Sequence, residues 1–167
     1  MLNKIANVCF IAACIALTLT AVTRYTSADK MPEATDGALR GQAIARTMLP
    51  DDTPAQTVLI VMSTTCQFCE ASMPFYARLQ QLADRSNHAI AVVFASLEAN
   101  ELTTSYLSER GIKGQTVSYG PGQLLVNGTP TLLLVNAAGV VTNGWLGQLS
   151  SRQETQLLRL LQSGTTL

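Results

Sequence analysis

The chain has 167 residues, equal numbers of acidic and basic residues, and a formal net charge of zero. No Lys or Arg stands next to another, so the sequence lacks the basic patch that a nucleic-acid-binding surface requires. Its length suits one domain with a hydrophobic core plus a short attachment. The four cysteines form one N-terminal pair and one pair in the body of the chain, which excludes a disulfide-rich scaffold.

The N-terminus carries an apolar segment, residues 5–22, without any charged residue between Lys4 and Arg24. Its length favours an uncleaved membrane-spanning signal anchor. Two alternatives are a signal peptide cleaved after Ala28 and a lipoprotein modified at Cys14. All three predict a domain outside the cytosol, in a compartment where disulfides persist. We therefore expect the periplasmic or extracytoplasmic side of a cell envelope, or secretion if the signal is cleaved.

Composition divides the chain into three predicted parts. Residues 1–28 form the signal anchor or signal peptide. Residues 29–55, rich in Thr, Asp, Ala, Gly and Pro, form a tether with an N-terminal element. Within that element residues 39–49 fit a short helix or a strand, and the pattern does not choose between them. Residues 56–167 form the folded domain.

Hydrophobic periodicity in this domain predicts alternating strands and helices. The predicted elements are a strand at 58–62, a helix at 66–85, a strand at 89–95, a helix at 98–110 closed by Gly111, strands at 131–135 and 140–142, and a last helix from 151. Pro74 should bend the first helix, and Ser151-Arg152-Gln153-Glu154 matches a capping box at the start of the last one. This order predicts an α/β fold with a central sheet, flanking helices and a C-terminal hairpin.

The sequence Cys66-Gln67-Phe68-Cys69 stands where the first predicted strand ends and the first helix begins. Backbone N–H groups at a helix start favour a thiolate, so we predict that Cys66 is the attacking thiol and Cys69 the shielded resolving thiol. The alternatives are a fixed structural disulfide or half of a zinc site. A zinc site needs four ligands of the Cys or His type, and only His88 remains in the domain. The spacing and setting therefore favour a redox-active dithiol without metal or other cofactor.

Several motifs together resemble the thioredoxin fold: the strand–CxxC–helix unit, Met73-Pro74 within that helix, and Gly128-Thr129-Pro130-Thr131 before a later strand. The chain is most similar to the membrane-anchored thiol–disulfide oxidoreductases of the TlpA/ResA type from bacterial cell envelopes. This resemblance implies that the Thr129–Pro130 bond is cis and lies beside the disulfide, and that the Thr129 backbone pairs with substrate. It also implies that residues 97–120 are the insert that distinguishes such proteins from a minimal thioredoxin.

Two positions depart from the family pattern. Ile60 stands where thioredoxin keeps a buried acid, and Ser72 where several TlpA-like proteins carry a glutamate. With no carboxylate expected beside the sulfurs, the pKa of Cys66 should be low, unless Glu70 turns inward and replaces the missing acid. Phe68 either contacts a partner protein, as a substrate-binding residue, or only covers the sulfur.

The expected function is thiol–disulfide exchange with cysteines of other proteins, with a membrane or envelope protein as electron donor or acceptor. The resemblance favours a reductase. A dithiol oxidase is the first alternative, because the Gln-Phe dipeptide matches neither of the best-known members of the fold. The second is a thioredoxin-like metallochaperone that holds Cu(I) between the two thiols, since soft thiolates suit that ion. Substrate binding is assigned to Thr129, Pro130 and Phe68, and membrane attachment to residues 5–22.

Overall fold

The computed structural model describes residues 39–52 and 54–163. The apolar segment at 5–22, the predicted cleavage site after Ala28, and Cys14 lie outside the described residues, so the membrane anchor stays a prediction. Within the described ranges, no helix is both long enough and apolar enough to cross a bilayer.

The domain is built on a five-stranded mixed sheet with the strand order β3-β2-β1-β4-β5. The strands are β1 (Gln56–Val61), β2 (Ile90–Ser96), β3 (Gln115–Ser118), β4 (Thr131–Asn136) and β5 (Val141–Leu146). Strands β1, β2 and β3 run parallel, whereas β4 is antiparallel to β1 and β5 is antiparallel to β4. The mixed sheet and the C-terminal hairpin confirm the predicted fold class, and β5 is longer than predicted.

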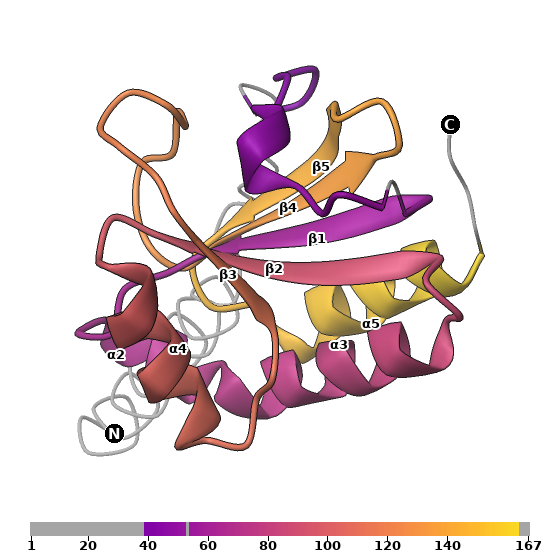
Figure 1. The fold of residues 1–167 in the computed structure, drawn as a ribbon. Coiled ribbons are helices and arrows are strands. Elements are labelled where there is room, and N and C mark those ends of the chain that lie inside the picture. Colours follow the sequence, from indigo (N-terminus) through magenta and orange to yellow (C-terminus); the bar gives the residue numbers. More distant parts are fainter. Residues whose placement is uncertain (1–38, 53, 164–167) are drawn as a thin grey trace, which may run out of the picture. The chain divides into compact units, whose positions relative to one another are not determined.

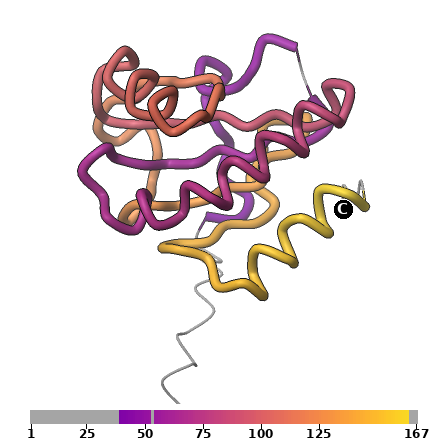
Figure 2. The backbone as a smooth tube through the Cα atoms, turned by 90° about the horizontal axis from the view of Figure 1, so that it is seen from below, coloured from indigo at the N-terminus to yellow at the C-terminus, as the bar shows by residue number. Residues whose placement is uncertain are grey.

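In residues 39–52 and 54–163, four α-helices and one short 3₁₀-helix pack around the sheet. They are η1 (Arg46–Met48), α2 (Gln67–Ala71), α3 (Met73–Arg85), α4 (Asn100–Ser108) and α5 (Ser151–Gln162). Helices α3 and α5 cover one face of the sheet, while η1 lies over the opposite face (Figure 1). Figure 2, seen from the helix side, shows α3 and α5 running across that face. The sheet is therefore covered on both sides, as its buried parallel strands require.

Side chains of the central strands alternate between two core layers, because successive residues of a strand point to opposite faces. On β1, Val58 and Ile60 pack with the side chains of α3 and α5, whereas Leu59 and Val61 pack with residues 39–49. All four side chains are fully buried. This burial on both faces explains why β1 is a continuous apolar run in the sequence rather than an alternating one.

Residues 39–49 belong to the core of the domain. The segment is neither the regular helix nor the strand considered from the sequence, because it makes one isolated β-bridge, Ala43 to Val140, and then the single turn η1. Its apolar side chains are buried against the sheet: Leu39, Ile44, Met48 and Leu49. The packed domain thus begins before residue 56, where the sequence placed its boundary, since these side chains cover a face that would otherwise meet water.

The predicted single helix over 66–85 is two helices. Helix α2 ends at Ala71, Ser72 joins the two, and α3 begins at Met73 with Pro74 in its first turn. Pro74 has no N–H to donate to the carbonyl of Glu70, and its ring would clash with that carbonyl in a continuous helix. The interruption therefore lies slightly before the proline, where we expected only a bend.

The capping box of the last helix lies one residue earlier than predicted. Ser150, not Ser151, is the N-cap, because Ser150 has an extended backbone and Ser151 is already helical. The Ser150 hydroxyl accepts from the N–H of Gln153 at 3.4 Å, and the Gln153 side chain accepts from the N–H of Ser150 at 2.9 Å. Both Gln and Glu can fill the third position of such a box, so the sequence offered two overlapping matches.

The insert at residues 97–120 contributes α4 and the edge strand β3. Helix α4 is shorter than the predicted 98–110, and Gly111 follows it with a φ of 73°, as a glycine that closes a helix does. Gly114 leads into β3 beneath the ring of Phe94, where an added Cβ would lie 2.4 Å from a ring carbon. The insert is thus packed directly against β2.

Candidate active site

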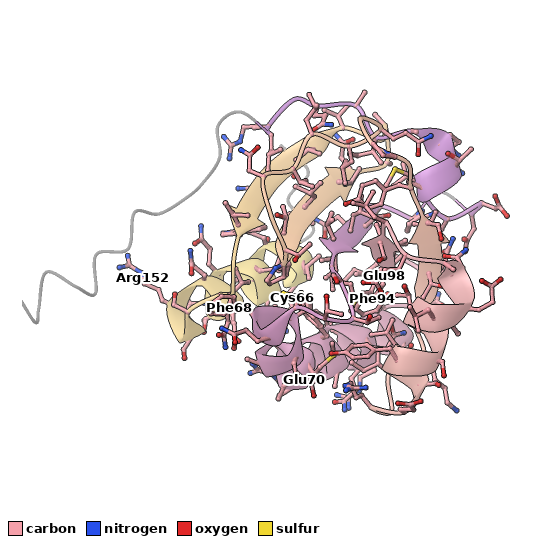
Figure 3. The ribbon with its side chains drawn as sticks, turned by 90° about the vertical axis from the view of Figure 1, so that its left-hand side faces the viewer. Cys66, Phe68, Glu70, Phe94, Glu98 and Arg152 are labelled. Carbon is pink, nitrogen blue, oxygen red and sulfur yellow. The ribbon has the colours of Figure 1, made fainter. Side chains whose placement is uncertain are left out.

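Three segments distant in sequence meet at one end of the sheet. Strands β1 and β2 are parallel, so the segment 62–66 after β1 and the segment 97–98 after β2 leave the sheet at the same edge. Strand β4 is antiparallel to β1 and pairs Thr131 with Val61, which brings residues 129–130 to this edge as well. Figure 3 views this end of the domain, with Cys66, Phe68 and Glu98 labelled.

Cys66 is the N-cap residue of α2. Its sulfur accepts a hydrogen bond from the backbone N–H of Cys69 at 3.2 Å, and it is partly exposed. Burial acts to raise the pKa of Cys66, but hydrogen bonds from the Cys69 thiol, from Thr129 and from the N–H groups of Cys69 and Phe68 outweigh it. The pKa of Cys66 therefore lies below that of an ordinary thiol, as predicted for the attacking cysteine.

Cys69 lies one turn further along α2 and is fully buried. Burial, and then the neighbouring Cys66, raise the pKa of Cys69 to about 12. Because the same burial hides the sulfur from any large partner, Cys69 can react only with a group already brought to Cys66. The two thiols, both free in this structure, thus have the unequal environments that the sequence predicted.

Thr129 and Pro130 lie beside Cys66. The Thr129–Pro130 peptide bond is cis, in agreement with the resemblance, and the Cys66 thiol donates to the carbonyl oxygen of Thr129 at 3.4 Å. Next to it, the N–H of Gly147 binds the Pro130 carbonyl at 2.7 Å, which ties this turn to the end of β5. The structure thus brings Thr129, predicted to bind substrate, into contact with the predicted attacking sulfur.

Phe68 projects from α2 and is 51% exposed. It does not bury the sulfur, since Cys66 keeps part of its own surface. Leu97, which follows β2 at this end of the sheet, is 63% exposed, and Leu125, in the loop before Thr129, is 70% exposed. Exposed apolar side chains near a reactive group are typical of a surface that meets another protein.

Glu98 is a site residue that the sequence analysis missed. One carboxylate oxygen accepts from the hydroxyl of Ser63 at 2.6 Å and from the N–H of Thr64 at 3.0 Å, and the other accepts from the same N–H at 3.2 Å. The sequence shows only that this acid stands two residues after a buried strand; that this strand lies beside the one before CxxC, and parallel to it, comes from the fold. We assigned it to the first turn of a solvent-facing helix instead.

Glu70 does not take the place of the missing acid. Its carboxylate accepts hydrogen bonds from the hydroxyl of Tyr106 and from Nε of Arg110, the latter at 2.8 Å, both reaching it from the insert. These two bonds, in that order, lower the pKa of Glu70. The alternative in which Glu70 turns toward the sulfurs is therefore wrong, because its carboxylate already binds Tyr106 of α4 and Arg110, two residues beyond the end of that helix.

The structure shows what surrounds Ile60 and Ser72, the two positions where the family carries an acid. Ile60 is fully buried, and the hydroxyl of Ser72 donates to the carbonyl of Phe68 at 2.7 Å. Among the described residues, no carboxylate is hydrogen-bonded to either sulfur. In the same part of the chain, no three His, Cys, Asp or Glu side chains gather in a way that could hold a metal ion.

Solved structures share this architecture at low sequence identity. A putative thiol:disulfide interchange protein DsbE from Chlorobium tepidum matches with a TM-score of 0.61 and 19% identity, covering 75% of this chain and 96% of that one. A thiol-disulfide isomerase from Corynebacterium glutamicum matches with a TM-score of 0.55 and 19% identity, over 83% and 99% of the two chains. StoA from Bacillus subtilis matches with a TM-score of 0.52 and 15% identity, over 65% and 85%.

At the sequence level no family model matches the chain, and no curated protein does either. The structural matches establish the fold. The chain has a thioredoxin-like fold, with CxxC at the start of α2 and a cis-proline beside it.

Proposed function

We propose that the protein is a thiol–disulfide oxidoreductase that acts on cysteines of other proteins. The observation that carries this proposal is the unequal pair of thiols. Cys66, at the helix start, is partly exposed and has a lowered pKa, whereas Cys69 is buried and has a raised one. A structural disulfide needs no such difference, but a nucleophile and a resolving thiol do.

The reaction proceeds in two exchanges. The Cys66 thiolate attacks one sulfur of a substrate disulfide, forms a mixed disulfide with it, and releases the other substrate sulfur as a thiolate that takes a proton from water. Cys69 then loses its proton and attacks the Cys66 sulfur, which closes the Cys66–Cys69 disulfide and releases the second substrate thiol. Two electrons pass from the dithiol to the substrate, and an external dithiol restores the reduced form.

The reducing direction is the one we propose. A strongly oxidising dithiol has a very stable thiolate, with a pKa near 3.5 in the best-known oxidase of this fold against about 7 in thioredoxin. Here the largest influences that lower the pKa of Cys66 are hydrogen bonds rather than cationic side chains. Thiolate stabilisation without a nearby positive charge is modest, which favours the reducing end of the range of potentials, near about −270 mV rather than −120 mV.

Protein substrates and an envelope location complete the proposal. The exposed side chains of Phe68, within the CxxC motif, and Leu97, in a segment that leaves the sheet at the same edge, favour a protein partner over a small disulfide. The TlpA/ResA-type fold and the apolar segment at 5–22 together support a domain held on the extracytoplasmic side by an N-terminal membrane helix, or secreted if that segment is cleaved. A membrane or envelope dithiol protein would then supply the electrons.

The test is catalysis of disulfide reduction together with a measured potential. With dithiothreitol as donor, the protein should accelerate reduction of insulin, and a variant with both Cys66→Ser and Cys69→Ser should not. Equilibration with glutathione buffers should then give a potential well below −200 mV. A potential near −120 mV would show an oxidase instead, and tight binding of Cu(I) without catalysis of exchange would show a metallochaperone.

A further inference from the structure

We propose that Glu98 is a positioning residue of the dithiol: its carboxylate holds the segment 63–65, from which the chain passes into Cys66 and α2. The proposal rests on the function proposed above. It gives a role to a half-buried carboxylate that the exchange chemistry itself does not use.

Burial does not hold the segment 63–65 in place. Met62 before it and Cys69 after it are buried in the core, but Ser63 and Thr64 are only half-buried and Thr65 is exposed. The segment carries polar side chains alone, so its position depends on hydrogen bonds. Glu98 accepts three of them, two from Thr64 N–H and one from the Ser63 hydroxyl.

The hydrogen bonds continue from Ser63 to both cysteines. The Ser63 hydroxyl also accepts from the N–H of Thr65 at 3.2 Å, and the Ser63 carbonyl accepts from the N–H of Cys66 at 3.2 Å. The Ser63 backbone in addition forms a hydrogen bond that acts to lower the pKa of Cys69. Ser63 therefore links the Glu98 carboxylate to the backbone of the attacking residue and to the sulfur of the resolving one.

Glu98 is itself fixed by its own backbone. Its N–H donates to the hydroxyl of Ser96 at the end of β2 at 3.0 Å, and its carbonyl accepts from the hydroxyl of Ser118 on β3 at 2.8 Å. The backbone of Glu98 is thus hydrogen-bonded to two neighbouring strands of the sheet, β2 and β3, and is not part of a free loop. A group held in this way can impose a fixed position on the segment that it binds.

Glu98 holds the segment through its oxygen atoms as hydrogen-bond acceptors, and its negative charge matters less for this role. Burial raises the pKa of Glu98, but the bonds from Ser63 and Thr64 outweigh it and lower the pKa, so the carboxylate is ionised at neutral pH. The influences on the pKa of Cys66 do not include the charge of Glu98. A glutamine, which keeps one oxygen acceptor, should therefore replace Glu98 in part, and an alanine should not.

The experiment measures the rate at which iodoacetamide alkylates Cys66 across a range of pH, on the reduced full-length protein. Peptide mass spectrometry separates Cys66 from Cys69 and from the N-terminal cysteines. For Glu98→Ala we expect a higher pKa of Cys66, by about half a unit to one unit, and at pH 7 a roughly three- to tenfold slower alkylation. Glu98→Gln should stay within about twofold of the unmodified protein, since its amide oxygen still accepts.

Glu101→Ala is the matched control. Glu101 is exposed on the first turn of α4, so its loss makes the same change in net charge close to Glu98 and should leave Cys66 unchanged. If Glu98→Ala does not fold, Ser63→Ala removes the 2.6 Å bond to Glu98 together with the contacts of the Ser63 hydroxyl to Thr65, keeps the Thr64 bonds to Glu98, and should shift the Cys66 pKa in the same direction, by less.

Two results would overturn the proposal. One is an unchanged Cys66 pKa in a folded Glu98→Ala or Ser63→Ala protein, even if its thermal stability falls, because that outcome leaves Glu98 a merely structural role. The other is an equal shift in Glu98→Gln and Glu98→Ala, because the charge would then matter and the acceptor would not. Alkylation needs no disulfide substrate, so failure to reduce insulin would reject the proposed function while this measurement still decided the role of Glu98.

Discussion

The two cysteines of the CxxC motif have sharply different environments although only Gln67 and Phe68 stand between them. Cys66 lies at the N-terminal end of α2, in the segment that follows β1. It is partly exposed, and the N–H of Cys69 is directed at its sulfur. Cys69 lies in the core between the sheet and α3, without exposed surface. Two thiols of the same helix thus differ in reactivity: Cys66 is reactive and Cys69 is not. Their difference comes from the end of a helix on one side and a low-dielectric core on the other.

Replacing Cys66 with Ser should have the largest effect, because it removes the only accessible thiol of the pair. Reduction of insulin by dithiothreitol should fall to the uncatalysed rate. Cys69 cannot substitute, since its sulfur is buried and its pKa is raised to about 12. Residual catalysis in this variant would mean that Cys69 is reached directly and that the two environments are less different than the structure shows.

Replacing Cys69 with Ser should leave the first exchange intact and abolish the second. The variant should accumulate mixed disulfides with protein substrates, visible on a non-reducing gel and released by dithiothreitol. Cys69→Ala is the control, because it should trap the same species without a buried hydroxyl. Normal turnover in either variant, with nothing trapped, would reverse the assigned roles.

The pH dependence should show one thiol and not two. The Cys66 thiolate should form below the ordinary thiol pKa of 9.0, and the rate of attack should rise in a single step through that lowered value. Ultraviolet absorbance of the thiolate measures it. A two-step rise near neutral pH would mean that another acid is coupled to the sulfur.

The same asymmetry should affect the stability of the reduced protein at high pH. The raised pKa of Cys69 stabilises the fold below 9.0, its ordinary value, and this contribution is lost as pH rises from there toward about 12. Denaturant unfolding of the reduced protein should therefore show falling stability over that range. In Cys69→Ala this part of the fall should be absent.

Thr129→Val should raise the pKa of Cys66 moderately. Thr129 gives a hydrogen bond that lowers the pKa of Cys66, and valine keeps nearly the same shape without the hydroxyl. We expect the pKa of Cys66 to rise by about half a unit to one unit, where each unit is a tenfold change in the ratio of thiolate to thiol. Thr129→Ser, which restores a hydroxyl, should return most of the difference; if Val and Ser behave alike, the hydroxyl has no part in holding the thiolate.

Glu70→Gln should have the smallest effect on the sulfurs. Its carboxylate binds Tyr106 and Arg110 of the insert, and the influences on the Cys66 pKa do not include it. The titration of Cys66 should therefore stay where it was, while the melting temperature falls only slightly because an exposed ion pair is weakened. A clear fall in the Cys66 pKa would revive the idea that Glu70 acts on the dithiol.

Local signals in the sequence were enough for the motif, its place between a strand and a helix, and the burial of both faces of β1. The apolar run of Val58 to Met62 and the helix start at the cysteines act over a few residues, so their effects are visible without the fold. The same holds for the unequal cysteines, because one turn of helix separates the start of α2 from its buried side.

Only the tertiary structure decided which side chains surround the dithiol. Glu98 and Thr64 are 34 residues apart, Glu70 and Tyr106 are 36 apart, and Cys66 and Thr129 are 63 apart. Each of these contacts depends on which strands are neighbours and in what direction they run, and neither is written in the residues themselves. For that reason the only acid that the sequence offered, and only as an alternative, was Glu70, the nearest along the chain, while the parallel pairing of β1 with β2 brought Glu98 to the segment before Cys66.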